Sequence, residues 1–329
     1  MSPVQIHVLA GFLDPRCGPQ RWQQLLARGD SDAVFLSWHW LRAWWETLGE
    51  GDLLLVAAER DGEIFALAPL YATCGMVHFL GSGESDYSDF VGDVGGAETL
   101  AAMLAAARER VADFLGFNLY VVPERSRSGQ RIEAAAHLLG LACVPKDEVP
   151  VLAVDLVGQH EALRATLGRS MLKREEHFRR HGALVVEQFG DLGAIRPHLD
   201  DFYAQYQGRW SVKPEPGPLA DPKQRAFLER CLRLAEGTGW IRFLRIEWQG
   251  RPLAFEFAWY YRDTHYSAPW CFAIEHAKHC PGHVLLRQSV LAALAAGLHS
   301  YDLGLGDQEY KFRLPVHAVP TRTWGLFPP

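Results

Sequence analysis

Two stretches of the chain repeat the same order of predicted elements, and this repetition limits the possible folds more than any other feature. In the first stretch, a helix precedes two β-strand patterns that meet at Asp61-Gly62, and a second helix and a further strand follow. An Asp-Gly pair between two apolar runs is typical of a tight hairpin turn. The predicted elements are a helix over Ser37–Leu48, strands over Leu53–Ala58 and Ile64–Tyr71, a helix over Thr99–Leu115 and a strand over Asn118–Val122.

The order restarts after a predicted strand at Val149–Val157, now with a hairpin at Gln249-Gly250 and a long helix at His283–Leu298. The other predicted elements are helices over Leu163–His181, Leu199–Trp210 and Arg225–Glu236 and strands over Ile241–Trp248, Pro252–Tyr261, His265–Phe272, Ser300–Leu305 and Thr323–Phe327. A chain of 329 residues is longer than one ordinary domain. We therefore expect two α/β domains related by an internal duplication, residues 1–150 and residues 151–329.

The composition argues against several classes of protein. A net charge of −6 and a pI near 6.2 disfavour a general DNA-binding protein. No apolar run in the sequence approaches the roughly 20 residues that a membrane-spanning helix needs, and the N-terminus lacks a signal-peptide pattern. The six cysteines form no CxxC pair, which is typical of reduced thiols in a cytosolic protein. We expect a cytoplasmic protein without a membrane span.

The segment from His276 to Leu298 is the strongest candidate for a binding site, because a strand ends there, a Pro-Gly pair turns the chain and a helix begins. The free N–H groups and the dipole at a helix N-terminus favour an anion. Pro281 suits the first turn, and Gly282 admits a ligand close to the backbone. An ordinary helix start would show the same pattern and is the alternative. The residues that would surround an anion are Lys278, His279, Pro281, Gly282, His283 and Val284.

Charged residues crowd the segment Ser300–Leu314, where Gly304 and Gly306 interrupt the end of a strand pattern. The charged side chains are those of Asp302, Asp307, Glu309, Lys311 and Arg313. Such a density of charge at the end of a strand favours the lining of a cleft or an ion-pair network over a packed core. A solvated loop is the alternative interpretation.

Two further features could carry chemistry. Glu256 lies in an aromatic strand, where it either faces solvent or is buried and able to act as a general base. The helix Leu163–His181 carries six arginines and lysines, which fits a solvated face or a contact with phosphates of a nucleotide, a glycan carrier or an RNA. We expect no metal site, because the Pro-Gly break prevents one helix from presenting His276, His279 and His283 together.

Four segments resemble the cellulose-biosynthesis-associated (CelD-like) GNAT acyltransferases, relatives of the Fem-type peptidyltransferases: FLSWHWLRAWWETLG, ALAPLY, FLGSGESDYSDFV and CPGHVLLRQSVLAALAAGLHSYDLGLGDQEYKFRL. The resemblance extends from Phe35 to Leu314 and implies a tandem GNAT fold, with mixed, mostly antiparallel sheets flanked by helices. It also implies acetyl-CoA or another acyl-CoA bound at Lys278–Val284. The chain departs from the family in having Leu305-Gly306-Asp307 where Arg-Gly-Asp is usual.

The resemblance implies transfer of an acyl group, first of all acetyl, to an amine of a sugar, amino acid or peptide-like acceptor, in polysaccharide or envelope biosynthesis. Because a thioester is already activated, the protein must mainly orient the substrates and take a proton from the amine. Glu256 is the first candidate for the base and Asp307 the second, with Tyr310 as an acid or acceptor-binding group. Lys311 and Arg313 are predicted to bind the acceptor.

The N-terminal half has no Pro-Gly helix start of its own, so we expect a degenerate copy that serves the acceptor side. Its motif Gly81–Tyr87 is predicted to shape the acceptor cleft, with Asp86 and Tyr87 as acceptor contacts. Two alternatives stay open. One is aminoacyl transfer from a charged tRNA in the Fem manner, which the basic helix favours and the acidic net charge disfavours. The other is an inactive GNAT scaffold in a polysaccharide-synthesis assembly.

Overall fold

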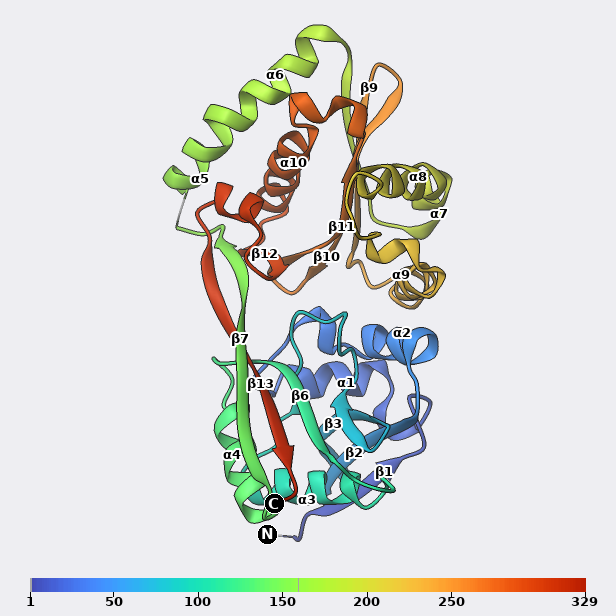
Figure 1. Ribbon diagram of the computed structural model, residues 1–329, viewed down its shortest axis with the longest axis vertical. Coiled ribbons are helices and arrows are strands. Elements are labelled where there is room, and N and C mark those ends of the chain that lie inside the picture. Colours follow the sequence, from blue (N-terminus) through green and yellow to red (C-terminus); the bar gives the residue numbers. More distant parts are fainter. Residues whose placement is uncertain (1, 159) are drawn as a thin grey trace. The chain divides into compact units, whose positions relative to one another are not determined.

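The computed structural model describes residues 2–158 and 160–329, which form two compact units (Figure 1). Unit 1 comprises the described residues up to Pro150 together with Val319–Pro329, and unit 2 comprises Val151–Ala318. The last residues of the chain, predicted to belong to the second domain, therefore lie in unit 1. Strands β7 (Ala142–Asp155) and β13 (His317–Phe327) contribute residues to both units.

Unit 1 places its strands in the order β1-β2-β3-β4-β6-β13-β7, and β5 pairs with β3. Its further elements are β1 (Gln5–Leu9), α1 (Pro19–Leu26), α2 (Trp38–Leu48), β2 (Asp52–Arg60), β3 (Glu63–Thr73), β4 (Met76–Phe79), β5 (Val91–Gly92), α3 (Ala97–Arg108), β6 (Gly116–Pro123) and α4 (Ser128–Leu138), with 3-10 turns at Pro15–Cys17 and Val34–Leu36. Apolar side chains of β2, β3, β4 and β6 pack against α3 and α4 and form the core of this unit.

The local sequence explains two elements of unit 1. The hydroxyl of Ser37 accepts a hydrogen bond of 3.2 Å from the N–H of Trp40 and caps the start of α2. Between β2 and β3, Asp61 has a φ of 53° and Gly62 a φ of 79°, the left-handed backbone that a two-residue hairpin turn requires. The predicted helix at Ser37–Leu48 and the predicted hairpin at Asp61-Gly62 are confirmed.

Unit 2 continues from β7 in the strand order β7-β12-β11-β10-β9-β8. Its helices are α5 (His160–Thr166), α6 (Leu172–His181), α7 (Leu192–Ile195), α8 (Leu199–Trp210), α9 (Pro222–Leu234) and α10 (Pro281–Ala295), with a π-helical turn at Leu167–Met171 and 3-10 turns at Arg196–His198, Pro218–Ala220, Ile274–His279 and Glu309–Arg313. Its further strands are β8 (Leu184–Phe189), β9 (Ile241–Trp248), β10 (Arg251–Tyr261), β11 (Thr264–Phe272) and β12 (Ser300–Leu305). In Figure 1, α10 and α8 lie on opposite sides of β10 and β11.

Alternation along β10 decides which side each of its residues faces. Phe255 and Phe257 face α8, where the ring of Phe202 lies 6.2 Å from the first and 5.0 Å from the second. Glu256, between them, faces the opposite side, which α6 and α10 cover. The side chain of Glu256 is therefore buried, with 4% of the residue exposed, and the solvent-facing interpretation is wrong.

The two units repeat one topology. Three antiparallel strands lead through a helix to a strand that pairs in parallel with the third: β2, β3, β4, α3 and β6 in unit 1, and β9, β10, β11, α10 and β12 in unit 2. The prediction that Thr323–Phe327 closes the second sheet is wrong, because β13 pairs there with β6 of unit 1, whereas β12 pairs with β7. The apolar pattern of a strand does not specify which neighbour it pairs with.

Candidate active site

The gap between β11 and β12 is the main feature of unit 2. Among the described residues, the two strands pair only where Thr264–Tyr266 meets Ser300–Asp302, although β11 continues to Phe272 and β12 to Leu305. Where they separate lies a narrow pocket of about 20 Å³, room for about one water molecule. Its lining comes from β10, β11, β12, α10 and the turn at Glu309–Arg313, and consists of Glu256, Ser267, Trp270, Gly282, Leu285, Leu286, Leu303 and Tyr310.

This pocket brings together three residues that were predicted separately. Glu256 comes from β10, Gly282 from the first turn of α10 and Tyr310 from the turn after β12. The ring of Tyr310 meets that of Trp270 edge to face, with 5.3 Å between the ring centres. A carboxylate, a helix start and a phenol thus share one opening in the sheet.

Hydrogen-bond donors surround the carboxylate of Glu256. The hydroxyl of Ser267 donates to its Oε1 at 2.9 Å, and the hydroxyl of Tyr301 donates to the same oxygen at 3.3 Å. The Tyr301 hydroxyl also lies 2.9 Å from that of Ser289 on α10. Burial and, next, the charge of Glu256 raise the pKa of Tyr301, so its phenol stays protonated and able to donate. The arrangement holds a carboxylate at the pocket in a fixed orientation, as a proton acceptor requires.

The start of α10 has the geometry of an anion site. Cys280 precedes the helix in the left-handed conformation, with a φ of 56°, and Pro281 is the first helical residue. Among the residues that the structure describes, no side chain caps the helix, and its first turn carries no acidic residue. A Cβ on Gly282 would lie 3.3 Å from Cδ1 of Phe272 and 3.5 Å from the ring of Trp270, so glycine lets these two rings pack closely against the first turn. The N–H groups at the start of the helix favour an anion.

Positive charge gathers around this helix start. Partial loss of hydration and then the charges of Lys278, His276, His181 and Arg174 lower the pKa of His279. Burial and then the charges of Arg313 and Arg174 lower the pKa of His283. The ring of His279 stacks on that of His177 on α6, with 4.2 Å between the ring centres. The positive side chains around Lys278–Val284 thus add to the effect of burial, and an anionic ligand would offset their charge.

The end of β12 is held by a buried lysine. Lys311 is 2% exposed, and its ammonium donates to the backbone carbonyl oxygens of Gly304, Leu305 and Gly306 at 2.7, 2.8 and 3.0 Å. The carboxylate of Asp302 accepts a hydrogen bond from the N–H of Gly304 at 2.8 Å. All three N–H groups of the Lys311 ammonium donate to these carbonyls. This favours a structural role for Lys311 over its predicted contact with the acceptor. No single predicted alternative describes the segment: Leu303 and Tyr310 line the pocket, whereas Asp307 and Arg313 are exposed.

Four other predicted site residues lie away from the pocket. Asp307 and Arg313 are exposed and do not line it, although Arg313 is close enough to His283 to lower its pKa. Asp86 lies half-buried in the unit 1 loop between β4 and β5. Tyr87, in the same loop, is 2% exposed and packs beside Phe35, which argues against its predicted contact with an acceptor.

Sequence patterns missed Ser267, Trp270, Tyr301 and His265. These residues acquire their place only through strand pairing: His265 lies opposite Tyr301 in the parallel register, and Trp270 lies opposite Glu256 on β10. Arg209 of α8 then covers the ring of Trp270, with its guanidinium carbon 3.8 Å from the ring centre. The sequence did predict the two strands, over His265–Phe272 and Ser300–Leu305. It did not indicate their register, which brings these side chains together.

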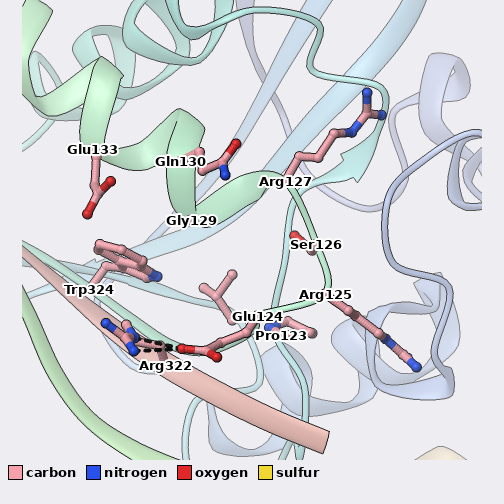
Figure 2. A pocket seen from close by; sticks show the side chains of 11 residues that line it. Pro123, Glu124, Arg125, Ser126, Arg127, Gly129, Gln130, Glu133, Arg322 and Trp324 are labelled. Atoms are coloured by element: carbon pink, nitrogen blue, oxygen red, sulfur yellow. Dashed lines mark hydrogen bonds and ion pairs between the residues drawn. The ribbon is translucent and has the colours of Figure 1, made fainter.

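Unit 1 holds a larger pocket, of about 370 Å³, between the end of β6, the start of α4 and β13 (Figure 2). Figure 2 shows Arg322 turned toward Glu124, with which it forms an ion pair of 2.7 Å, and Glu133 and Gln130 on α4 near Trp324. Arg127, at the other side, pairs with Asp30. Both signs of charge line this pocket, and these pairings satisfy several of them, so it indicates no class of ligand.

A sequence profile described as acetyltransferase (GNAT) domain matches residues 167–312, a range that contains the whole pocket between β11 and β12. No curated protein sequence matches the chain significantly. Among the described residues, no helix is long and apolar enough to cross a membrane, and no group of His, Cys, Asp or Glu side chains is placed to hold a metal ion.

Several solved structures share the fold across nearly the whole chain. FemX matches with a TM-score of 0.65 and 12% identity, covering 93% of this chain and 95% of its own. A tandem GNAT protein from the clavulanic acid biosynthesis pathway matches with a TM-score of 0.57 and 11% identity, covering 98% of both chains. L-PGS from Bacillus licheniformis matches with a TM-score of 0.58 and 14% identity, covering 94% and 92%. The chain therefore has the GNAT fold, a mixed sheet flanked by helices, with an acetyltransferase-type domain in its second half.

Proposed function

We propose that the chain is an N-acyltransferase that takes an acyl group, first of all acetyl, from acyl-CoA bound at the start of α10. The acceptor is an amine that enters the gap between β11 and β12. The observation that carries this assignment is the coincidence of three features within the range of the acetyltransferase profile: separated strands, an uncapped helix start and a buried carboxylate beside both.

The donor site is favoured by charge. The phosphates of CoA are anions, and Lys278, His279 and His283 lie among positive side chains whose charges, after burial, help to lower the pKa values of both histidines. Bound phosphates would accept hydrogen bonds from the N–H groups of the first turn, where the lack of a side chain on Gly282 exposes the backbone. The acyl arm would then reach toward the pocket between β11 and β12, which Gly282 also lines. The two strands would have to separate further to admit the arm, because the pocket has room for about one water molecule.

Glu256 is the base in this proposal. An amine must be deprotonated before it attacks a thioester, and a carboxylate held by Ser267 and Tyr301 at the pocket is placed to accept that proton. Tyr310, which also lines the pocket, would give a proton to the departing thiolate. Backbone N–H groups at the separated strands would stabilise the oxyanion of the intermediate. Asp307, exposed and outside the pocket, becomes a minor candidate.

The acceptor is proposed only as a class: the amine of a sugar, an amino acid or a peptide-like molecule. A role in polysaccharide or envelope biosynthesis, an affiliation with the CelD-like group and a cytoplasmic location stay predictions. Unit 1, whose topology repeats that of unit 2, is proposed as the degenerate partner of the catalytic domain.

A second candidate function is aminoacyl transfer from a charged tRNA. The observation that favours it is the exposed basic face of α6, where Lys173, Arg174 and Arg180 lie close to the positive region at the start of α10. A polyanion would bind along such a face and lose affinity steeply with salt. FemX, which shares the fold, keeps this possibility open.

Calorimetric titration of the full chain with acetyl-CoA, free CoA and bulk tRNA tests the donor, and release of CoA thiol in the presence of an amine panel tests the reaction. We expect acetyl-CoA to bind and thiol to appear only when an amine is present, with Glu256→Gln as the inactive control. Binding of tRNA without binding of CoA would support the second candidate. Binding of neither would point to a non-catalytic scaffold and overturn both.

A further inference from the structure

We propose that His265 is a positioning residue for Glu256, and that the buried imidazole and the carboxylate act together as one proton-accepting pair. The chemistry assigned to the pair rests on the proposed acyl transfer, whereas the existence of the pair rests on the geometry of unit 2. His265 comes from the start of β11 and Glu256 from the middle of β10, so the sheet itself brings them together.

The imidazole of His265 is buried but unsatisfied. The residue is 1% exposed, and neither ring nitrogen has a hydrogen-bond partner among the described residues. Its Nε2 lies 3.7 Å from Oε1 of Glu256, slightly beyond a hydrogen bond. A buried polar group without a partner destabilises a protein. If the position were purely structural, an apolar ring would be more stable there. The two unsatisfied nitrogens therefore favour a role for His265 in binding a proton.

Tyr301 ties the two residues into one cluster. Its ring stacks on the imidazole with 4.0 Å between the ring centres and 13° between the planes. Its hydroxyl donates to the Glu256 oxygen that lies nearest to His265 and contacts Ser289 on α10. The stacking fixes the plane of the imidazole, and the hydrogen bonds fix the carboxylate. A proton on either member therefore stays within reach of the other.

Among the side chains that face the His265 imidazole, Glu256 is the anionic one. From β10, Glu256 and Tyr260 face the imidazole, with the Tyr260 ring centre 5.4 Å away; from β12, Tyr301 faces it. The phenol of Tyr310 contributes, as the last of several causes, to the raised pKa of Tyr301. Burial raises the pKa of Tyr260 and of Tyr301, so both phenols are neutral at physiological pH. Within the described part of the chain, the cluster thus joins one carboxylate to one imidazole.

The pair accounts for one proton of the reaction. An N–H bond of the acceptor ammonium breaks, and its proton is bound by Glu256 and shared with His265. The free amine then attacks the thioester carbonyl. When the tetrahedral intermediate collapses, the C–S bond breaks, Tyr310 gives its proton to the thiolate to form CoA thiol, and the second amine proton restores the Tyr310 phenol. The pair returns its own proton to solvent, so an ammonium and a thioester become an amide, a thiol and one released proton.

The pair is tested first without any substrate. In the full chain labelled with ¹⁵N-histidine, the side-chain resonances of His265 are identified by their loss in His265→Gln. We expect Glu256→Gln to shift these resonances at pH 7, because the imidazole loses its charged partner. The matched control is Glu247→Gln, on the neighbouring strand β9. His265 resonances that are the same in wild type, Glu256→Gln and the control would overturn the pair, whether or not acyl transfer is ever detected.

The role of the pair is tested in the pH dependence of kcat. Two interacting ionisable groups titrate as one unit. His265→Gln should therefore move the acid limb of the profile and lower kcat about tenfold, with little change in the KM of the acceptor. His299→Gln, at an exposed histidine, is the control. Should His265→Gln not fold, His265→Phe keeps the ring on Tyr301 and removes both nitrogens. An unmoved acid limb in a folded His265 variant would overturn the role.

Discussion

Glu175 of α6 and Arg287 of α10 form an ion pair of 2.5 Å in which the carboxylate is 5% exposed. Gln288 donates to the same carboxylate, and the Nε of Arg287 donates to the carbonyl of Leu167 in the π-helical turn. A single buried carboxylate therefore joins α6 to α10, the helix whose start is the proposed donor site. The Glu175 carboxylate would therefore affect function by fixing the position of α10.

Replacing Glu175 with alanine leaves the largely buried guanidinium of Arg287 without its carboxylate partner. Removal of one partner from a buried pair costs about 3 kcal/mol of unfolding free energy, which lowers the Tm of a unit of this size by roughly 6–10 °C. We expect Glu176→Ala, at the exposed neighbouring position, to leave the Tm nearly unchanged. The measurement is thermal unfolding of both variants. Equal Tm values would mean that the ion pair does not hold α10.

Gly282 is predicted to be needed for donor binding. Alanine would bring its Cβ to 3.3 Å from Phe272, a contact that a small shift relieves, whereas valine would also fill the space before the first turn. We expect calorimetry to show CoA affinity reduced modestly in Gly282→Ala and at least about tenfold in Gly282→Val, or about 1.4 kcal/mol. Gly208→Ala on α8, where a Cβ meets nothing, is the control. Wild-type affinity in a folded Gly282→Val protein would remove the donor from this helix.

The helix start was accessible to sequence reasoning because its signals are local. Pro281 and Gly282 stand side by side in the chain, and the rules for a helix N-terminus need no distant partner. Hairpins at Asp61-Gly62 and Gln249-Gly250 were predicted for the same reason: two neighbouring residues fix the turn.

The environment of Glu256 was not accessible in that way. Its neighbours Ser267, His265 and Tyr301 lie 9 to 45 residues away in the sequence and meet it only through the pairing of β10, β11 and β12. The burial of Lys311 could not be predicted from the sequence either. A lysine in a charged segment is most often exposed, and its burial depends on three carbonyls that the bend of β12 turns inward.

Donor binding should strengthen as the pH falls. His279 and His283 have pKa values below the ordinary 6.5 in the free protein, and a bound anion would raise them, so binding takes up protons. We expect the Kd of CoA to change little between pH 8 and 7 and to fall by about three- to tenfold between about pH 7 and 5.5. Without ligand, the same lowered pKa values make the fold less stable below about pH 6.5, since the unfolded chain then binds more protons.

The phosphates of CoA also titrate near pH 6, so the histidine contribution needs its own control. The double variant with His279→Gln and His283→Gln retains only the titration of the ligand. Calorimetry in two buffers of different ionisation enthalpy measures the proton uptake directly. Identical uptake by the wild type and the double variant would show that these histidines do not face the anion.

Glu256 and Asp307 are distinguished by their surroundings, although both were candidates for the base. Glu256 is buried and lines the pocket, whereas Asp307 is exposed and does not. We expect Glu256→Gln to lower kcat by about 10²- to 10⁴-fold and Asp307→Asn by less than about threefold, with the KM of the donor unchanged in both. Steady-state rates with one acyl-CoA and one amine decide the matter. A large loss in Asp307→Asn alone would transfer the role of base to that residue.

Lys311 offers the last test, because two roles for it make different predictions. As a structural residue it satisfies three carbonyls at the end of β12, between Leu303 and Tyr310, both of which line the pocket. Lys311→Met would leave these carbonyls without a donor. The cost is about 3 kcal/mol, seen as a Tm lowered by roughly 6–10 °C, and kcat should fall about tenfold as Tyr310 loses its position. As an acceptor-binding residue, Lys311 would instead raise the KM of the acceptor when replaced and leave the Tm unchanged. Arg313→Met, two residues further and exposed, is the matched control for both measurements. A normal Tm with a raised acceptor KM would restore the binding role, and with it a charged acceptor close to Gly304–Gly306.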